Sequence, residues 1–224
     1  MSDESNAMTG HPHETASTES LPEEIANAVT HGIGAALSIA CLVVLVLFAA
    51  VDGGALAVTA VAIFGASLIL LYLTSTLYHA IAHHKAKRVL QVLDHCTIFL
   101  LIAGTYTPVA LLVPLDGPDW LLFAIVWALA AAGIIMRVAG GRRYRKLKIV
   151  LYLAMGWLVI AWSGPMIEGL GFGGSGLLLA GGIAYTGGIA FYVWDSLPFN
   201  HAVWHLFVMA GSAAHFFAVA IYIV

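Results

Sequence analysis

The sequence has few charged residues, and basic residues are absent from most of its length. Only 9% of the 224 residues are Asp, Glu, Lys or Arg, whereas 61% are hydrophobic. A soluble domain of this length needs a polar shell around its core, and this composition cannot supply one. The composition therefore excludes a soluble globular protein and predicts an integral membrane protein.

Cysteine is also scarce, and the N-terminal segment lacks both basic residues and a long apolar run. The two cysteines, Cys41 and Cys96, fall within predicted spans, so we expect buried free thiols rather than a disulfide. The composition of residues 1–22 excludes a secretory signal peptide and predicts a disordered polar tail. We therefore expect residues 23–224 to form the membrane domain.

Long uncharged runs occupy most of that domain. A helix needs about 20 apolar residues to cross about 30 Å of hydrocarbon, so spans can be counted between turn and charge signals. The count gives seven spans, at residues 28–51, 54–79, 93–113, 119–139, 147–164, 175–194 and 202–224. The predicted fold class is all-α, a bundle of seven transmembrane helices.

The nine Lys and Arg residues orient this bundle. All of them lie in Lys85–Arg88 and Arg137–Lys148, and seven spans place both stretches on the same side as the N-terminal tail. Cytoplasmic loops carry an excess of basic residues. We therefore expect a cytoplasmic N-terminus and an extracytoplasmic C-terminus.

The second basic stretch, Arg137–Lys148, has two possible roles. It either only holds the loop in the cytoplasm or also binds anionic lipid headgroups, where each basic residue near the surface contributes about 1 kcal/mol of binding free energy. Nucleic-acid binding is disfavoured because the run lies tight against two spans. The residues concerned are Arg142, Arg143, Arg145, Lys146 and Lys148.

Polar residues gather at the predicted cytoplasmic ends of three spans. They are Ser75 and His79 in the second span, Asp94 in the third, and His201 and His205 in the seventh. Ionisable residues within spans are costly and are functional candidates by default. The last two histidines are four residues apart and share one helix face. Ordinary polar residues at a helix end would give the same pair, but a third histidine at the same depth favours a metal site.

Three histidine ligands and an open fourth position are typical of catalytic zinc. We therefore predict Zn²⁺ bound by His79, His201 and His205. Zinc lowers the pKa of its bound water to about 7. Asp94 would then act as general base, with Ser75 helping to hold the water. Histidine ligands also suit iron and other transition metals, so the identity of the metal stays open.

Four further polar residues allow simpler roles. Asn27 and His31 either line the site or form hydrogen bonds at a helix start. His95 points about 100° away from the preceding carboxylate, and we expect it to pack against neighbours. His215 lies ten residues, thus about 15 Å, beyond the last predicted ligand. There we expect an interhelical hydrogen bond rather than a proton relay.

Four strings of residues follow one another in the order found in a known family. They are Glu24-x-x-Asn27-x-x-Thr30-His31, Ser75-x-x-x-His79, Asp94-His95 followed by Ile102-Ala103-Gly104-Thr105-Tyr106-Thr107-Pro108, and His201-x-x-Trp204-His205 ending in His215-Phe216-Phe217. Together they resemble the bacterial hemolysin III family over about residues 23–224. That family is the bacterial branch of the progestin and adiponectin receptor superfamily, which is grouped with alkaline ceramidases as membrane hydrolases.

The resemblance implies a seven-helix protein of the bacterial plasma (inner) membrane with zinc near the cytoplasmic face. The ligands would be His79, His201 and His205, with Asp94 and Ser75 beside the metal. We expect a zinc-dependent hydrolase that cleaves an amide or ester bond of a membrane lipid and contributes to membrane homeostasis. Substrate and oligomeric state stay open.

Other classes of function are weighed against this expectation. The main alternative is a non-enzymatic membrane sensor or regulator in which zinc is structural. A pore-forming cytolysin follows only from the family's historical label, and the chain shows no amphipathic switch segment. An ion carrier is disfavoured because charged groups are missing from the outer half of the predicted bundle.

Overall fold

The computed structural model describes residues 19–141 and 143–224, and every regular element in those ranges is helical. The predicted all-α class is therefore confirmed. Residues 1–18 of the predicted tail, and Arg142 of the second basic stretch, lie outside the described residues. The elements are α1 (Leu21–Asp52), α2 (Gly54–Ala80), α3 (His84–Leu112), α4 (Trp120–Gly140), α5 (Arg145–Gly156), the 3₁₀ helix η1 (Leu158–Trp162), α6 (Ser163–Tyr192) and α7 (Asn200–Tyr222).

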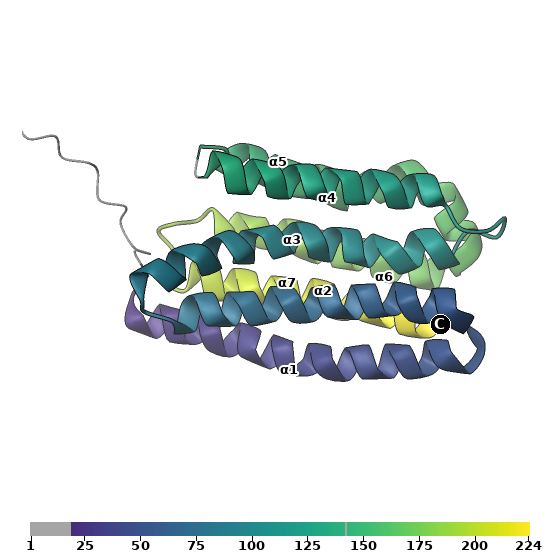
Figure 1. Ribbon diagram of the computed structural model, residues 1–224, viewed down its shortest axis with the longest axis horizontal. Coiled ribbons are helices and arrows are strands. Elements are labelled where there is room, and N and C mark those ends of the chain that lie inside the picture. The colour runs from purple at the N-terminus through teal and green to yellow at the C-terminus, as the bar shows by residue number, and fades with distance from the viewer. Residues whose placement is uncertain (1–18, 142) are drawn as a thin grey trace, which may run out of the picture.

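Six helical stretches of the described chain are long and apolar enough to cross a membrane. Five of them correspond to α1, α2, α3, α4 and α7. The sixth, Lys146–Tyr192, runs through α5, η1 and α6 and contains 47 residues. A straight helix of that length would measure about 70 Å, more than twice the hydrocarbon thickness. The chain turns back between α5 and the main part of α6 (Figure 1), and α6 has a kink at Gly171, whose φ of 63° is not helical.

The helices lie along a common long axis (Figure 1). Helix α1 packs on α2 and α7, α2 packs on α3, α3 on α4, and α6 on α7. The two basic stretches lie at the start of α3 and from the end of α4 to the start of α5, at the end of the bundle where α1 and α7 begin (Figure 1). We call this the basic end of the bundle. The C-terminus lies at the opposite end.

Helices α1 and α3 begin with polar turns that lie before the predicted spans. Helix α1 begins at Leu21 rather than at 28, because the Glu23 carboxylate accepts a hydrogen bond from the Ser20 backbone N–H at 2.9 Å and caps the first turn. Helix α3 begins at His84 rather than at 93, because the His83 ring accepts from the backbone N–H of Ala86. Hydropathy marks only the apolar part of each helix, so both polar first turns were missed.

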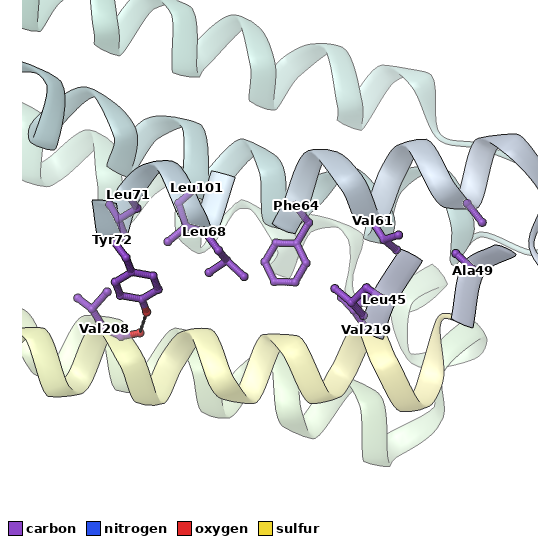
Figure 2. Close-up of a cluster of buried hydrophobic side chains, with 11 residues drawn as sticks. Leu45, Ala49, Val61, Phe64, Leu68, Leu71, Tyr72, Leu101, Val208 and Val219 are labelled. Atoms are coloured by element: carbon purple, nitrogen blue, oxygen red, sulfur yellow. Dashed lines mark hydrogen bonds between the residues drawn. The ribbon is translucent and has the colours of Figure 1, made fainter. Parts of the chain in front are cut away.

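The main apolar core joins α1, α2 and α7 (Figure 2). Phe64 is fully buried at its centre, with Leu45 of α1 and Val219 of α7 beside it. Toward the basic end, the Tyr72 hydroxyl donates to the Ser212 hydroxyl of α7 at 2.7 Å. This core holds the last turn of α2 against the first turns of α7.

The contact between α2 and α3 depends on a glycine. A Cβ at Gly104 would overlap the Ser67 side chain of α2. Overpacking of this kind costs about 1–3 kcal/mol, so we expect Gly104→Ala to lower the thermal unfolding temperature of the purified protein. Gly176→Ala is the matched control, since a Cβ there meets nothing within 4 Å. Equal unfolding temperatures for the two variants would contradict the close approach of the helices.

Candidate metal centre

Three imidazoles from α2 and α7 converge at the basic end. His79 lies in the last turn of α2, and His201 and His205 lie at the start of α7. One ring nitrogen of each lies within 4.8 Å of those of the other two. The ring centroids are 5.0 Å apart for His79 and His201, 5.3 Å for His79 and His205, and 4.6 Å for His201 and His205. This group could hold a metal ion.

Glu24 of α1 fixes the orientation of His79. One carboxylate oxygen, Oε2, accepts from His79 Nδ1 at 2.8 Å, while Oε1 accepts from Lys87 Nζ at 2.6 Å. Because Nδ1 carries its proton toward a carboxylate, Nε2 holds the lone pair. That Nε2 is buried and has no hydrogen-bond partner among the described residues. A buried orphaned acceptor is costly, and a metal ion bound there would satisfy it.

Thr30 of α1 orients His205 as Glu24 orients His79, through a contact with Nδ1. The Thr30 hydroxyl directs its proton to backbone carbonyls of its own helix, at 2.9 Å from Ala26 and 3.0 Å from Asn27. Its oxygen is therefore an acceptor for His205 Nδ1, 3.1 Å away. This leaves the lone pair of His205 on Nε2, as for His79. The residues present thus fit a histidine-bound cation, with two ligands already in the tautomer that metal binding requires.

Glu19, immediately before α1, also reaches the cluster. Its carboxylate oxygens lie 3.6 Å from His79 Nδ1 and 3.8 Å from His201 Nδ1. The Asn27 side-chain amide donates to Glu19 Oε2 at 2.7 Å and holds it in place. Burial raises the pKa of the Glu19 carboxyl above its usual value, and the neighbouring His79 opposes that rise. Sequence reasoning missed this residue, since it lies in the range expected to be disordered tail.

Asp94 and Ser75 lie beside the histidines. Both are buried, and the Ser75 side chain lies near the Asp94 carboxylate. Both line one cavity together with His201 and His205. The structure therefore brings the predicted ligands and the two predicted catalytic residues to one place. Their roles as ligands and catalytic groups stay predictions.

The cavity beside the site has a volume of about 140 Å³ and is bounded mainly by α3, α5, α6 and α7. Its walls are largely apolar and aromatic, as at Leu71, Ile98 and Trp204. Thr105 and His215 line both this cavity and a second one of about 330 Å³, so the two adjoin. A long apolar space that ends at a polar cluster has the shape and chemistry to hold a hydrocarbon chain.

The structure also places the polar residues whose roles were open. His31 lines the cavity, and its ring stacks on His205 with centroids 3.5 Å apart. His215 contacts the Leu178 carbonyl of α6 at 3.1 Å, which is the interhelical hydrogen bond expected from sequence. His95 accepts from Arg137 Nε at 3.0 Å and so packs against α4.

Comparison with known proteins agrees with the motifs. Residues 19–216 match the sequence model of a family described as "Haemolysin-III related". The chain belongs to the haemolysin-III family. Hemolysin-3 of Bacillus cereus is 51% identical over 210 residues, which is 93% of this chain and 95% of that protein. The Hemolysin-3 homolog of Bacillus subtilis (strain 168) is 50% identical over 205 residues, which is 91% of this chain and 96% of that protein.

A more distant relative comes from animals. The monocyte to macrophage differentiation factor of Homo sapiens is 30% identical over 167 residues, covering 70% of this chain and 67% of that protein. The family predicted from the sequence motifs is thus confirmed. Family membership and the apolar helices together make this haemolysin-III protein an integral membrane protein.

The orientation of His79 yields a test of the centre. We expect Glu24→Gln to weaken metal binding about 10–100-fold, because the charged acceptor that holds Nδ1–H is lost. Competition with a metallochromic chelator measures the affinity. Glu168→Gln, at an exposed position on α6, should leave the affinity unchanged. Equal affinities in the two variants would show that Glu24 does not orient the ligand.

Proposed function

We propose that this haemolysin-III protein is a zinc-dependent hydrolase that cleaves an amide or ester bond of a membrane lipid and contributes to membrane homeostasis. One observation carries the proposal. One ring nitrogen of His79 lies within 4.8 Å of ring nitrogens of two further imidazoles, its Nε2 is buried without a partner among the described residues, and the buried Asp94 carboxylate and an apolar cavity lie beside the cluster. A cation site, a proton acceptor and a space for a hydrocarbon chain therefore adjoin one another.

The proposal includes a membrane orientation. Helix α5 with η1 forms one crossing and α6 another, which makes seven crossings with the N-terminus in the cytoplasm and the C-terminus outside. The turn between α5 and the main part of α6 supports the count, and the gathering of both basic stretches at one end supports the orientation (Figure 1). The membrane is the bacterial plasma (inner) membrane, so the metal centre lies near the cytoplasmic face at headgroup depth.

Each part of the site has a distinct task. His79, His201 and His205 would hold zinc, which when bound polarises a carbonyl and acidifies water. Asp94 accepts the proton of the attacking water, and the Ser75 hydroxyl donates to Asp94 and fixes its orientation. The apolar cavity binds the lipid chain and excludes bulk water, so that the bond to be cleaved lies at the histidine cluster.

Metal content tests the ligand set. We expect about one zinc ion per chain in the purified wild type and markedly less in His79→Ala, His201→Ala and His205→Ala, because each loses one of three ligands. Elemental analysis by mass spectrometry measures the ratio. His84→Ala, at an exposed position before the basic residues of α3, is the control and should keep its metal. Wild-type zinc content in all three ligand variants would refute the centre.

Lipid turnover tests the chemistry. We expect Asp94→Asn to retain zinc and to lower the hydrolysis rate of ceramides or other acyl lipids about 10²–10⁴-fold, because the proton acceptor is lost. The released fatty acid measures the rate. A variant that hydrolyses at the wild-type rate would remove Asp94 from the mechanism, and a zinc-loaded wild type that cleaves none of these lipids would count against hydrolysis.

A second candidate function, a membrane sensor or regulator with a structural zinc, is supported by the helices to which the metal ligands belong. The imidazoles belong to α2 and α7, and the groups that orient them belong to α1. A bound ion would therefore tie three helix ends together, as a structural zinc does in a membrane sensor or regulator. In that case the Asp94→Asn variant retains full function in cells, and metal removal lowers the unfolding temperature.

A further inference from the structure

One ring nitrogen of His215, in α7, has no hydrogen-bond partner among the described residues. The other nitrogen, Nε2, lies 3.1 Å from the Leu178 carbonyl of α6, and a carbonyl oxygen only accepts, so Nε2 carries the proton. Nδ1 therefore holds a lone pair, and this atom is buried. A buried acceptor without a donor costs free energy, above all within a membrane. The described side chains thus leave an acceptor unsatisfied at this depth.

The His215 ring lies where the two cavities of the bundle meet. Six described residues line both cavities, and we call this group the junction: Thr105, Tyr106, Gly156, Trp157, Gly182 and His215. The Cδ2–Nε2 edge of the ring packs against α6, since a Cβ at Gly181 would lie 2.3 Å from both atoms. Nδ1 is on the part of the ring that faces away from Gly181.

The side-chain donors of the junction are already used within the protein. The Thr105 hydroxyl donates to a backbone carbonyl of its own helix at 2.8 Å, and the Tyr106 hydroxyl donates to the Met155 carbonyl at 2.9 Å. The Trp157 indole N–H donates to the Thr186 hydroxyl at 3.0 Å. A hydroxyl oxygen that donates once still has lone pairs, so Thr105 remains an acceptor. The described side chains of the junction therefore offer acceptors and no free donor.

The position of the junction along α7 sets its distance from the metal centre. His215 follows His205 by ten residues, which corresponds to about 15 Å of helix. Both residues line the same cavity. An extended hydrocarbon chain covers that length of about 15 Å in about twelve carbons. A chain whose polar end lies at the histidine cluster therefore passes the junction near its twelfth carbon.

The chemistry of the junction selects one kind of donor. An amide N–H would bring a carbonyl oxygen with it, and that oxygen would find no free donor among the described side chains. An ammonium group would bring a charge to membrane depth, which is costly. A hydroxyl donates one hydrogen bond and brings neither a carbonyl nor a charge. It is the donor that an acceptor-only site in an apolar cavity accommodates best.

We propose that the junction binds a hydroxyl group on the acyl chain of the ligand, about twelve carbons from the end that lies at the metal centre. The hydroxyl donates to Nδ1 of His215, and the Thr105 oxygen is the other acceptor of the junction. This inference narrows the substrate class of the proposed hydrolase to lipids with a hydroxylated chain. It rests on the proposed function for the presence of a lipid chain in the cavity.

The experiment measures binding to the full chain in phosphatidylcholine nanodiscs. The probes are octadecanoate, 12-hydroxyoctadecanoate, 12-methoxyoctadecanoate and 2-hydroxyoctadecanoate. Affinities are referred to the probe concentration within the membrane, measured with empty nanodiscs, so that differences in partition cancel. We expect the 12-hydroxy probe to bind about fivefold or more tightly than octadecanoate, as for one net hydrogen bond. The methoxy probe, which cannot donate, and the 2-hydroxy probe, whose hydroxyl lies near the carboxylate, should show no such gain.

Substitutions assign the gain to the junction. His215→Phe removes the acceptor and should reduce the gain to less than twofold, and Thr105→Val should reduce it in part. Thr59→Val is the matched control for the second variant, because the Thr59 hydroxyl also donates to the carbonyl four residues earlier but is exposed on α2. It should leave the gain unchanged. A His215→Phe variant with the wild-type gain would overturn the proposal.

The comparison of probes in the wild type needs no variant and is valid even where His215→Phe does not fold. Equal affinities for octadecanoate and the 12-hydroxy probe would overturn the proposal and assign the junction to water only. An equal gain for the methoxy probe would also overturn it, since donation would then not be needed. The probes contain no bond for this site to hydrolyse. A failure of the proposed hydrolysis would therefore leave the expected gain intact, and a missing gain would leave metal content and turnover to be judged separately.

Discussion

The buried Nε2 atom of His79 has no hydrogen-bond donor among the described residues, and the side chains at the basic end of the bundle are arranged around it. Within a membrane, water is not at hand to satisfy such an atom, so the protein or a bound ion must do so. Glu24 and Thr30 hold the Nδ1 atoms of His79 and His205 and so leave both lone pairs on Nε2. Helix α1 thus determines which nitrogen of each ring is available to a metal ion, although α1 supplies no imidazole to the cluster of three.

The first turns of α1 link several parts of the bundle. Glu24 contacts His79 of α2 and Lys87 of α3, and Glu23 accepts a hydrogen bond from the backbone N–H of Phe199, just before α7, at 3.1 Å. Association of helices in lipid gains little from the hydrophobic effect, so close packing and polar contacts specify which faces meet. The close approach at Gly104 and the carboxylates of α1 serve this purpose at different depths.

Hydropathy and spacing were sufficient to predict an all-helical membrane protein and to predict that three imidazoles lie at one end of it. His201 and His205 share a face because they are four apart, and His79 ends an apolar run at the same depth. The spacing of Glu24, Asn27 and His31 also places these residues on one helix face, although their contacts with α2 and α7 depend on packing between helices far apart in sequence.

Three features of the structure could not be predicted because no sequence pattern marks them. Glu19 precedes its helix within a polar segment, so neither hydropathy nor periodicity marks it. Lys148 is the last residue of a basic stretch that is typical of a cytoplasmic loop. Whether its side chain points into the bundle depends on the rotation of α5 about its axis, which the sequence does not specify. The kink at Gly171 lies in a glycine-rich apolar stretch, where hydropathy barely changes between one helix and the next.

The cavity walls divide into two sets of helices. The histidine cluster and the groups that orient it come from α1, α2 and α7, whereas much of the remaining lining, including Tyr152, Tyr185 and Thr105, comes from α5, α6 and α3. The proposed ion site and most of the cavity walls are therefore encoded by largely separate stretches of the chain. Substitutions in α5 or α6 would therefore change the shape of the cavity and leave the positions of the three histidines unchanged.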